Sequence, residues 1–189
     1  PGIIHDTFLE AVSTARHSIR IINPYCTLCP HLKRALKEAV ARGVDVQVMV
    51  SEKSDIPITP RIVEYNVNKL MRAGVKVYFY QGGFHHSKIM MVDSIYSFIG
   101  SANLNSRSLS FDYECNLLIA DAPTTHQLIS LFNRDRDEHC YLLTPELWKQ
   151  LPKWNKFKGW LFHFLTPFVD APKRRQGIPG MIIIDRLYA

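Results

Sequence analysis

Two hydrophobic periods alternate along the first 80 residues of the chain. Stretches in which apolar residues recur every three or four positions, as in an amphipathic helix, are each followed by a short apolar run of strand length. The predicted helix and strand pairs lie at 5–17 and 18–25, at 31–43 and 44–50, and at 61–73 and 75–80. Gly43 and Gly74 stand where the second and third helices should end. Three successive helix–strand units favour parallel strands covered by helices.

The pattern changes after residue 80. Apolar runs at 87–92 and 95–100 are separated only by Asp93 and Ser94, and a connection this short joins only antiparallel strands. The last predicted elements of this part are a strand at 114–120 and a helix at 124–140. The sequence therefore predicts an α/β fold whose central sheet is mixed, mainly parallel and sandwiched between helices, with an antiparallel hairpin in the sheet.

The size and composition of the chain fit an ordinary globular domain. Its 189 residues are enough for one domain with a sizeable core, and 47% of them are hydrophobic. Because the first residue is Pro1 rather than Met, we expect the chain to be a piece of a longer polypeptide.

Positive charge is concentrated near the C-terminus. The net charge is +6, and residues 149–175 carry seven basic side chains against one acid, Asp170. Three tryptophans lie in or beside this segment, and its apolar run at 159–169 is shorter than the roughly 20 residues that span a bilayer. The mixture is typical of an interfacial helix on an anionic membrane. Packing of the same helix on the domain is the alternative interpretation.

The four cysteines are too few for a disulfide scaffold of this length, which favours a reducing compartment. Cys26 and Cys29 have the spacing of a redox pair or of half a zinc site. A zinc site needs two further ligands at matched spacing, and the sequence has no second motif of that kind. We therefore interpret the two residues as thiols in a loop.

A histidine and a lysine stand two residues apart where the hairpin begins. If residues 86–92 form a strand, His86 and Lys88 project to the same side, because alternate side chains share a face. Burying an ammonium group without a partner costs several kcal/mol, so Lys88 should face a cleft that holds an anion. The same alternation turns His85 away from this face, which predicts a structural role for it.

Donors and an acid follow at matching positions. Ser101 and Asn103 offer hydroxyl and amide groups that suit phosphate oxygens, and the carboxylate of Glu114 is placed to hold the Nδ1 proton of His86. A nucleophile, a cation, neutral donors and an orienting acid meet the needs of phosphodiester cleavage without a metal. Two-metal chemistry needs a carboxylate cluster, which this region lacks. We expect neither a metal nor another cofactor.

These residues carry a family resemblance. His86-x-Lys88-x4-Asp93, then Gly100-Ser101-x-Asn103 and Glu114, resembles the HKD signature of the phospholipase D superfamily. The flanking stretches "AVARGVDVQVMV", "LMRAGVKVYFY" and "ECNLLIAD" look like the C-terminal half of a bacterial cardiolipin synthase, and the likeness covers about residues 1–169.

The resemblance implies a role for each residue of the motif. His86 would attack phosphorus to give a phosphohistidine, or would serve as the acid that protonates the leaving alcohol. Lys88 and Asn103, with Ser101 in support, would bind phosphate oxygens, and Glu114 would orient His86. Asp93 completes the catalytic motif, but in such folds it tends to be structural. Arg107 would either contact the phosphate or brace the turn after the hairpin, and Asp55 would line the alcohol pocket or be an ordinary polar loop residue.

The implied reaction is phosphatidyl transfer between phosphatidylglycerol molecules. It needs two histidine motifs and the chain has one, so the second would come from a missing N-terminal half, which we favour, or from a homodimer partner. The resemblance also places the parent chain at the bacterial inner membrane. Alternatives are a phospholipase that transfers to water, a single-motif homodimeric nuclease that binds nucleic acid, and a binding module without catalysis.

Three segments follow from this interpretation. Residues 1–150 would be the phospholipase D-like catalytic half-domain, and residues 151–169 a basic aromatic helix. Residues 170–189 lie outside the resemblance, and the sequence assigns them no role.

Overall fold

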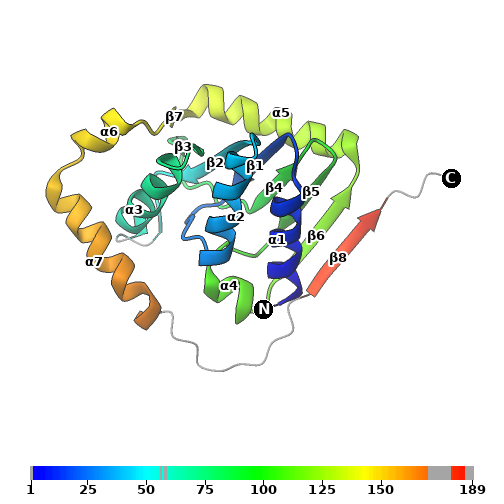
Figure 1. Ribbon diagram of the computed structural model, residues 1–189, viewed down its shortest axis with the longest axis horizontal. Coiled ribbons are helices and arrows are strands. Elements are labelled where there is room, and N and C mark those ends of the chain that lie inside the picture. Colours follow the sequence, from blue (N-terminus) through cyan, green and yellow to red (C-terminus); the bar gives the residue numbers. More distant parts are fainter. Residues whose placement is uncertain (1, 56, 58, 170–179, 186–189) are drawn as a thin grey trace.

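The computed structural model describes residues 2–55, 57, 59–169 and 180–185, with side chains up to residue 163. Within this part of the chain one eight-stranded sheet runs in the order β7-β3-β2-β1-β4-β5-β6-β8 (Figure 1). The strands are β1 (Ser18–Ile22), β2 (Asp45–Ser51), β3 (Lys76–Tyr80), β4 (Ile89–Val92), β5 (Tyr96–Gly100), β6 (Cys115–Ala120), β7 (Cys140–Leu142) and β8 (Gly180–Asp185).

The sheet is mixed, as the sequence predicts. Strands β1, β2 and β3 are parallel neighbours, which confirms the three helix–strand units. Pairing is antiparallel between β1 and β4, β4 and β5, β5 and β6, and β3 and β7. Parallel pairing resumes only between β6 and β8. Three of the seven pairings among the described strands are therefore parallel, fewer than expected, because the hairpin and β7 add antiparallel neighbours.

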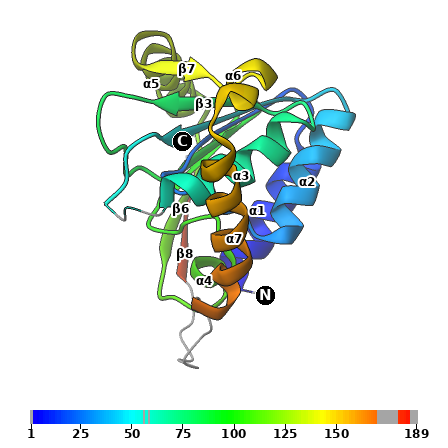
Figure 2. The same ribbon diagram turned by 90° about the vertical axis from the view of Figure 1, so that its left-hand side faces the viewer.

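Helices cover both faces of the sheet. Those of the described chain are α1 (Ile3–Thr14), α2 (Pro30–Ala41), α3 (Thr59–Met71), α4 (Ser106–Ser110), α5 (Ala122–His139), α6 (Pro145–Gln150) and α7 (Lys153–Val169). Buried residues of α1, α2 and α3 pack with one face of the central strands into the larger core. On the other face, Ile129 and Phe132 of α5 pack against Met49 and Met91. The predicted sandwich between helices is confirmed (Figures 1 and 2).

The hairpin turn has the conformation that a two-residue connection requires. Asp93 and Ser94 have φ values of 52° and 60°, in the left-handed region that primed turns need at both central positions. The N–H of Ile95 donates to the carbonyl of Val92 at 3.0 Å and closes the turn. The antiparallel hairpin inferred from the sequence is confirmed.

The C-terminal helix packs on the domain. Helix α7 runs alongside α3 (Figure 2), and Gly159 permits the close approach, because a Cβ at that position would lie 2.5 Å from the carbonyl oxygen of Arg61. Packing on the domain was the alternative to membrane contact, and here one face of the helix is packed. Its outer face exposes Trp154, Phe157 and Trp160.

The tail contributes a strand that the sequence analysis left without a role. Strand β8 pairs in parallel with β6, with Leu117 opposite Ile182 in the register. Residues 170–179 and 186–189 of the tail lie outside the described residues.

Candidate active site

His86 is exposed in the segment that leads from β3 into β4. Because β4 begins at Ile89, His86 and Lys88 precede the strand, and the strand alternation used in the sequence analysis does not apply to them. The imidazole lies beside two aromatic rings, with centroid distances of 5.1 Å to Phe84 and 6.2 Å to Tyr25. The ring is thus supported by aromatic side chains and open to solvent.

Lys88 folds back toward His86. Its Nζ donates to the backbone carbonyl of His86 at 2.6 Å, so the ammonium group and the imidazole belong to one local arrangement. Burial lowers the pKa of Lys88, while the negative charges of Glu114 and Asp55 act in the opposite direction. The charge of Lys88 is thus influenced by two carboxylates that come from different parts of the chain.

Glu114 does not contact His86 as expected. Its two carboxylate oxygens accept hydrogen bonds from the hydroxyls of Ser101 and Ser108. Ser101 follows β5 and Ser108 belongs to α4, so Glu114 joins the end of the hairpin to the short helix after it. Ser101 is therefore held by the carboxylate in this arrangement, and within the described residues no hydrogen bond connects Glu114 to the imidazole.

Asp55 is hydrogen-bonded to Tyr25, whose ring lies beside His86. Its carboxylate accepts a hydrogen bond from the hydroxyl of Tyr25 at 2.9 Å. That bond is the main cause of a lowered pKa for Asp55, and the charge of His86 contributes to the shift. From the sequence, Asp55 could line the site or be an ordinary loop residue, and Tyr25 and Phe84 were not predicted as neighbours of His86. Their aromatic character was the only property in the sequence that could have indicated this role.

Asn103 offers a half-buried amide. Its backbone N–H donates to the hydroxyl of Ser108 at 2.9 Å, but among the described residues its Oδ1 atom is buried without a hydrogen-bond partner. A buried polar atom without a partner is costly. The other end of the amide, Nδ2, is the group that can donate a hydrogen bond to an oxygen of a bound phosphate.

Asp93 lies at the far end of β4 from His86. Its Oδ1 accepts from the backbone N–H groups of His17 and Ser18 at 2.7 and 2.8 Å, and its Oδ2 from that of Arg16 at 2.8 Å. Burial acts to raise its pKa, but these three bonds lower it below the ordinary value. The catalytic residues predicted from the motif were His86, Lys88, Asp93 and Glu114. Among them, Asp93 has the structural contacts that the family resemblance implies.

Two neighbouring residues also have structural partners. The Nε2 atom of His85 is 3.6 Å from the carboxylate of Asp135 on α5, so this ring is turned away from Lys88. Arg107 pairs with Asp112 at 3.2 Å, which corresponds to the bracing role rather than the phosphate contact.

The two spaced cysteines are buried free thiols in the main core. Burial raises the pKa of Cys26 to about 12. In the described part of the chain no group of three or more histidine, cysteine, aspartate or glutamate side chains is gathered as metal ligands.

Comparison with known proteins identifies the family. The profile of the family described as "Cardiolipin synthase, PLD-like domain" matches residues 8–136. The chain belongs to this family. As a cardiolipin synthase-type PLD-like domain, it contains the whole segment from His86 to Glu114 within the matched residues.

Curated relatives agree with the profile. Cardiolipin synthase A of Yersinia pseudotuberculosis is 34% identical over 167 residues, which is 88% of this chain and 34% of that protein. Cardiolipin synthase 1 of Staphylococcus epidermidis is 36% identical over 162 residues, 86% of this chain and 33% of that protein. The PLD-like chain thus spans about a third of the length of these relatives.

Solved structures show the same fold. Phosphatidylserine synthase of Haemophilus influenzae superposes with a TM-score of 0.65 at 19% identity, over 89% of this chain and 42% of that one. A phospholipase D family member of Salmonella typhimurium, Nuc, superposes with a TM-score of 0.62 at 21% identity, over 73% of this chain and 89% of that one. At these identities the likeness concerns the fold of the PLD-like domain.

Proposed function

We propose that this domain carries one histidine motif of a cardiolipin synthase-like enzyme that transfers phosphatidyl groups between phosphatidylglycerol molecules. The arrangement of His86 and Lys88 carries the proposal: the imidazole of His86 is exposed, and the ammonium group of Lys88 donates to the backbone carbonyl of the same residue. The half-buried amide of Asn103 supplies a further donor for phosphate through Nδ2. Curated relatives named cardiolipin synthase support the lipid substrate.

The reaction has two steps. In the first, an imidazole nitrogen of His86 attacks phosphorus, a P–N bond forms, and the P–O bond to the headgroup glycerol breaks. A second histidine gives the leaving alkoxide a proton. In the second, the primary alcohol of another phosphatidylglycerol loses its proton to that histidine and attacks phosphorus, which breaks the P–N bond and releases cardiolipin. His86 would instead be the acid and base if the other motif supplies the nucleophile.

Lys88 and Asn103 act on the charge that develops at phosphorus. Donors fixed in a partly dehydrated site stabilise the equatorial oxygens of the transition state more than those of the ground state. Lys88 is half-buried, so its ammonium group is worth more there than at an open surface. We assign Glu114 to the positioning of Ser101 and Ser108, and Asp55 with Tyr25 to the side of the site where the second alcohol enters.

The second histidine must come from outside the described motif. The chain spans about a third of the curated relatives, which fits a remaining part of a longer polypeptide as its source. A second copy of the chain is the other source. A dimeric site would give turnover that rises more steeply than protein concentration, whereas a missing half leaves the isolated chain slow at every concentration.

The outer face of α7 supports contact with an anionic membrane. The ring of Trp154 stacks on that of Phe157 with their centroids 5.5 Å apart, and the centroids of Phe157 and Trp160 are 5.8 Å apart. All three rings are exposed, Trp154 at 61% of its surface, and the ammonium group of Lys158 lies 5.4 Å from the Trp154 ring. Aromatic rings beside lysines suit the headgroup region of anionic lipids. Of the described helices, none has both the length and the apolar character needed to cross a bilayer.

Trapping of the covalent adduct tests the proposal, with adjacent histidines as matched variants. The chain is mixed with phosphatidylglycerol vesicles, with a bis-nitrophenyl phosphodiester and with DNA, each with and without chelator. Because the second motif is absent from the isolated chain, we expect a slowly formed, chelator-insensitive phosphatidyl adduct on His86, lost in His86→Ala and kept in His85→Ala. Cleavage of DNA without lipid turnover would replace the proposal by the nuclease alternative. Unchanged activity of His86→Ala would refute both.

A further inference from the structure

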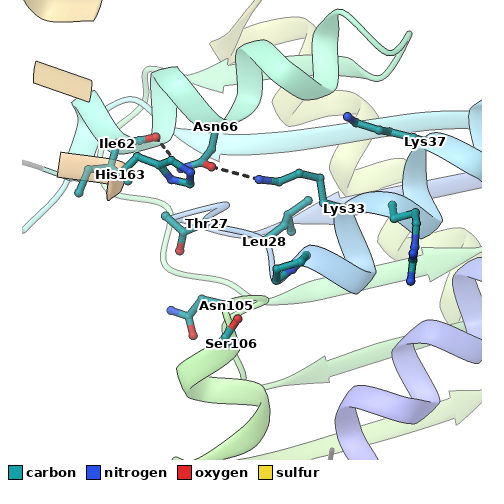
Figure 3. Close-up of a pocket in the computed structure, with 11 residues that line it drawn as sticks. Thr27, Leu28, Lys33, Lys37, Ile62, Asn66, Asn105, Ser106 and His163 are labelled. Atoms are coloured by element: carbon teal, nitrogen blue, oxygen red, sulfur yellow. Dashed lines mark hydrogen bonds between the residues drawn. The ribbon is translucent and has the colours of Figure 1, made fainter. Parts of the chain in front are cut away.

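A cavity of about 450 Å³ lies apart from His86, between α2, α3, α7 and the start of α4 (Figure 3). Helix α2 contributes Lys33, Arg34 and Lys37 to its wall, and α3 contributes Asn66. The complete lining is Thr27, Leu28, Pro30, Lys33, Arg34, Lys37, Ile62, Asn66, Asn105, Ser106 and His163. None of the motif residues is among these, so the cavity is separate from the site described above.

The charge of this cavity is uncompensated. Lys33, Arg34 and Lys37 are cations, and no aspartate or glutamate is among the described residues that line it. Three positive charges around one cavity repel one another, and the half-buried ammonium group of Lys33 costs free energy unless an anion is near. The lining therefore favours occupation by a negatively charged group.

Lys33 is held at the cavity wall by a neutral partner. Its Nζ donates to Oδ1 of Asn66 at 3.3 Å, and Nδ2 of Asn66 donates to the carbonyl of Ile62 at 2.9 Å (Figure 3). The amide orients the ammonium group but leaves its charge intact. Burial lowers the pKa of Lys33, the charges of Lys69 and Lys37 lower it further, and Cys26 and Cys29 act in the opposite direction.

The cavity also offers neutral donors on the side opposite Lys33. The side chain of Asn105 accepts from the N–H of Ser108 through Oδ1 at 2.7 Å, so its Nδ2 group keeps two donor hydrogens. Thr27, Asn105 and Ser106 lie across the cavity from Lys33 (Figure 3). Cations on one side and neutral donors on the other match the oxygens of a phosphate group.

We propose that this cavity binds a phosphate group, and that the group belongs to the headgroup of the second phosphatidylglycerol. The lipid assignment rests on the proposed function, whereas the phosphate assignment stands on the lining alone. Asn105, which lines the cavity, is two residues along the chain from Asn103 of the proposed catalytic site. The cavity would then hold the acceptor lipid by its own phosphate.

Side-chain amide signals in a ¹⁵N NMR titration test the site and separate it from the catalytic one. Inorganic phosphate, glycerol 3-phosphate and soluble dihexanoyl phosphatidylglycerol are added in turn to the 189-residue chain. We expect the Asn66 and Asn105 signals to shift with each ligand. Lys88→Gln changes only the catalytic site, so it should leave the shifts of Asn66 and Asn105 in place and reduce the shift of Asn103. The two sites are thereby tested separately, and failure of the catalytic proposal would not affect the result for the cavity.

Charge variants complete the test. Arg34→Gln and Lys37→Gln, both at exposed positions, should each weaken phosphate binding about tenfold, the effect of one charge-assisted bond. Arg134→Gln on α5, across the sheet, makes the same charge change as a matched control and should leave the affinity unchanged. Equal weakening by Arg134→Gln, or unshifted Asn66 and Asn105 signals, would overturn the site. Binding of inorganic phosphate without binding of the lipid would overturn the lipid assignment.

Discussion

The carboxylate of Asp93 holds three backbone N–H groups where α1 passes into β1, and replacing it by an amide tests whether it is structural. In Asp93→Asn the left-handed backbone, with φ of 52°, is tolerated. Oδ1 remains as a neutral acceptor for His17 and Ser18, while the N–H of Arg16 faces an NH₂ group instead of Oδ2. The change therefore removes charge and one acceptor without altering the turn.

The expected loss of stability follows from these three bonds. One hydrogen bond is lost and two change from charge-assisted to neutral. Each of these three changes costs roughly 1 kcal/mol before screening by solvent is considered. Because water reaches this junction, we halve the sum and expect about 1.5 kcal/mol, or a fall in Tm of about 3–6 °C for a domain of this size. Urea and thermal unfolding measure it.

The pH dependence has a definite sign. The folded pKa of Asp93 is depressed, so its stabilisation is complete above the unfolded pKa, about 3.9, and is lost as the pH falls through the folded value. The difference between wild type and Asp93→Asn should be constant from about pH 7 to pH 5 and should shrink below about pH 4.

A matched carboxylate provides the control. Asp112 forms a half-exposed ion pair with Arg107, so Asp112→Asn should change the free energy of unfolding by less than about 0.5 kcal/mol. Phosphodiester turnover at low temperature should survive in Asp93→Asn. A variant of normal stability that has lost turnover would refute the structural assignment of Asp93.

Three further predictions concern packing, thiols and the membrane face. Gly100→Ala should lower the free energy of unfolding by about 2–3 kcal/mol in urea, because a Cβ there would collide with Asn116 and the carbonyl of Cys115; an unchanged midpoint would contradict this packing. In native protein at pH 8, iodoacetamide should modify exposed Cys115 first and spare Cys26, which is buried with a thiol pKa raised to about 12. Mass spectrometry measures the order of labelling, and early modification of Cys26 would contradict this expectation. Trp154→Ser with Trp160→Ser should reduce sedimentation with phosphatidylglycerol vesicles at least tenfold with stability within about 0.5 kcal/mol of wild type, whereas equal sedimentation would exclude α7 as the contact.

Much of the fold follows from local pattern. Helical and strand periods report which side of each element is buried, so the units formed by α1 with β1, α2 with β2 and α3 with β3 are predictable. The Asp93–Ser94 connection fixes the hairpin, since few turns can join strands across two residues. Periodicity does not report which strand lies beside which, and β7 and β8 were therefore missed as neighbours of β3 and β6.

The sequence by itself determined the residue types of the site, because the motif from His86 to Glu114 is contiguous enough to be read along the chain. Only the tertiary structure decided their partners: Glu114 joins two serines, Asp55 approaches His86 through Tyr25, and Lys33 of α2 meets Asn66 of α3. These pairs join segments up to 33 residues apart in the chain. Their formation depends on how helices and loops settle on the sheet, and a one-dimensional pattern of polar and apolar residues carries no record of that packing.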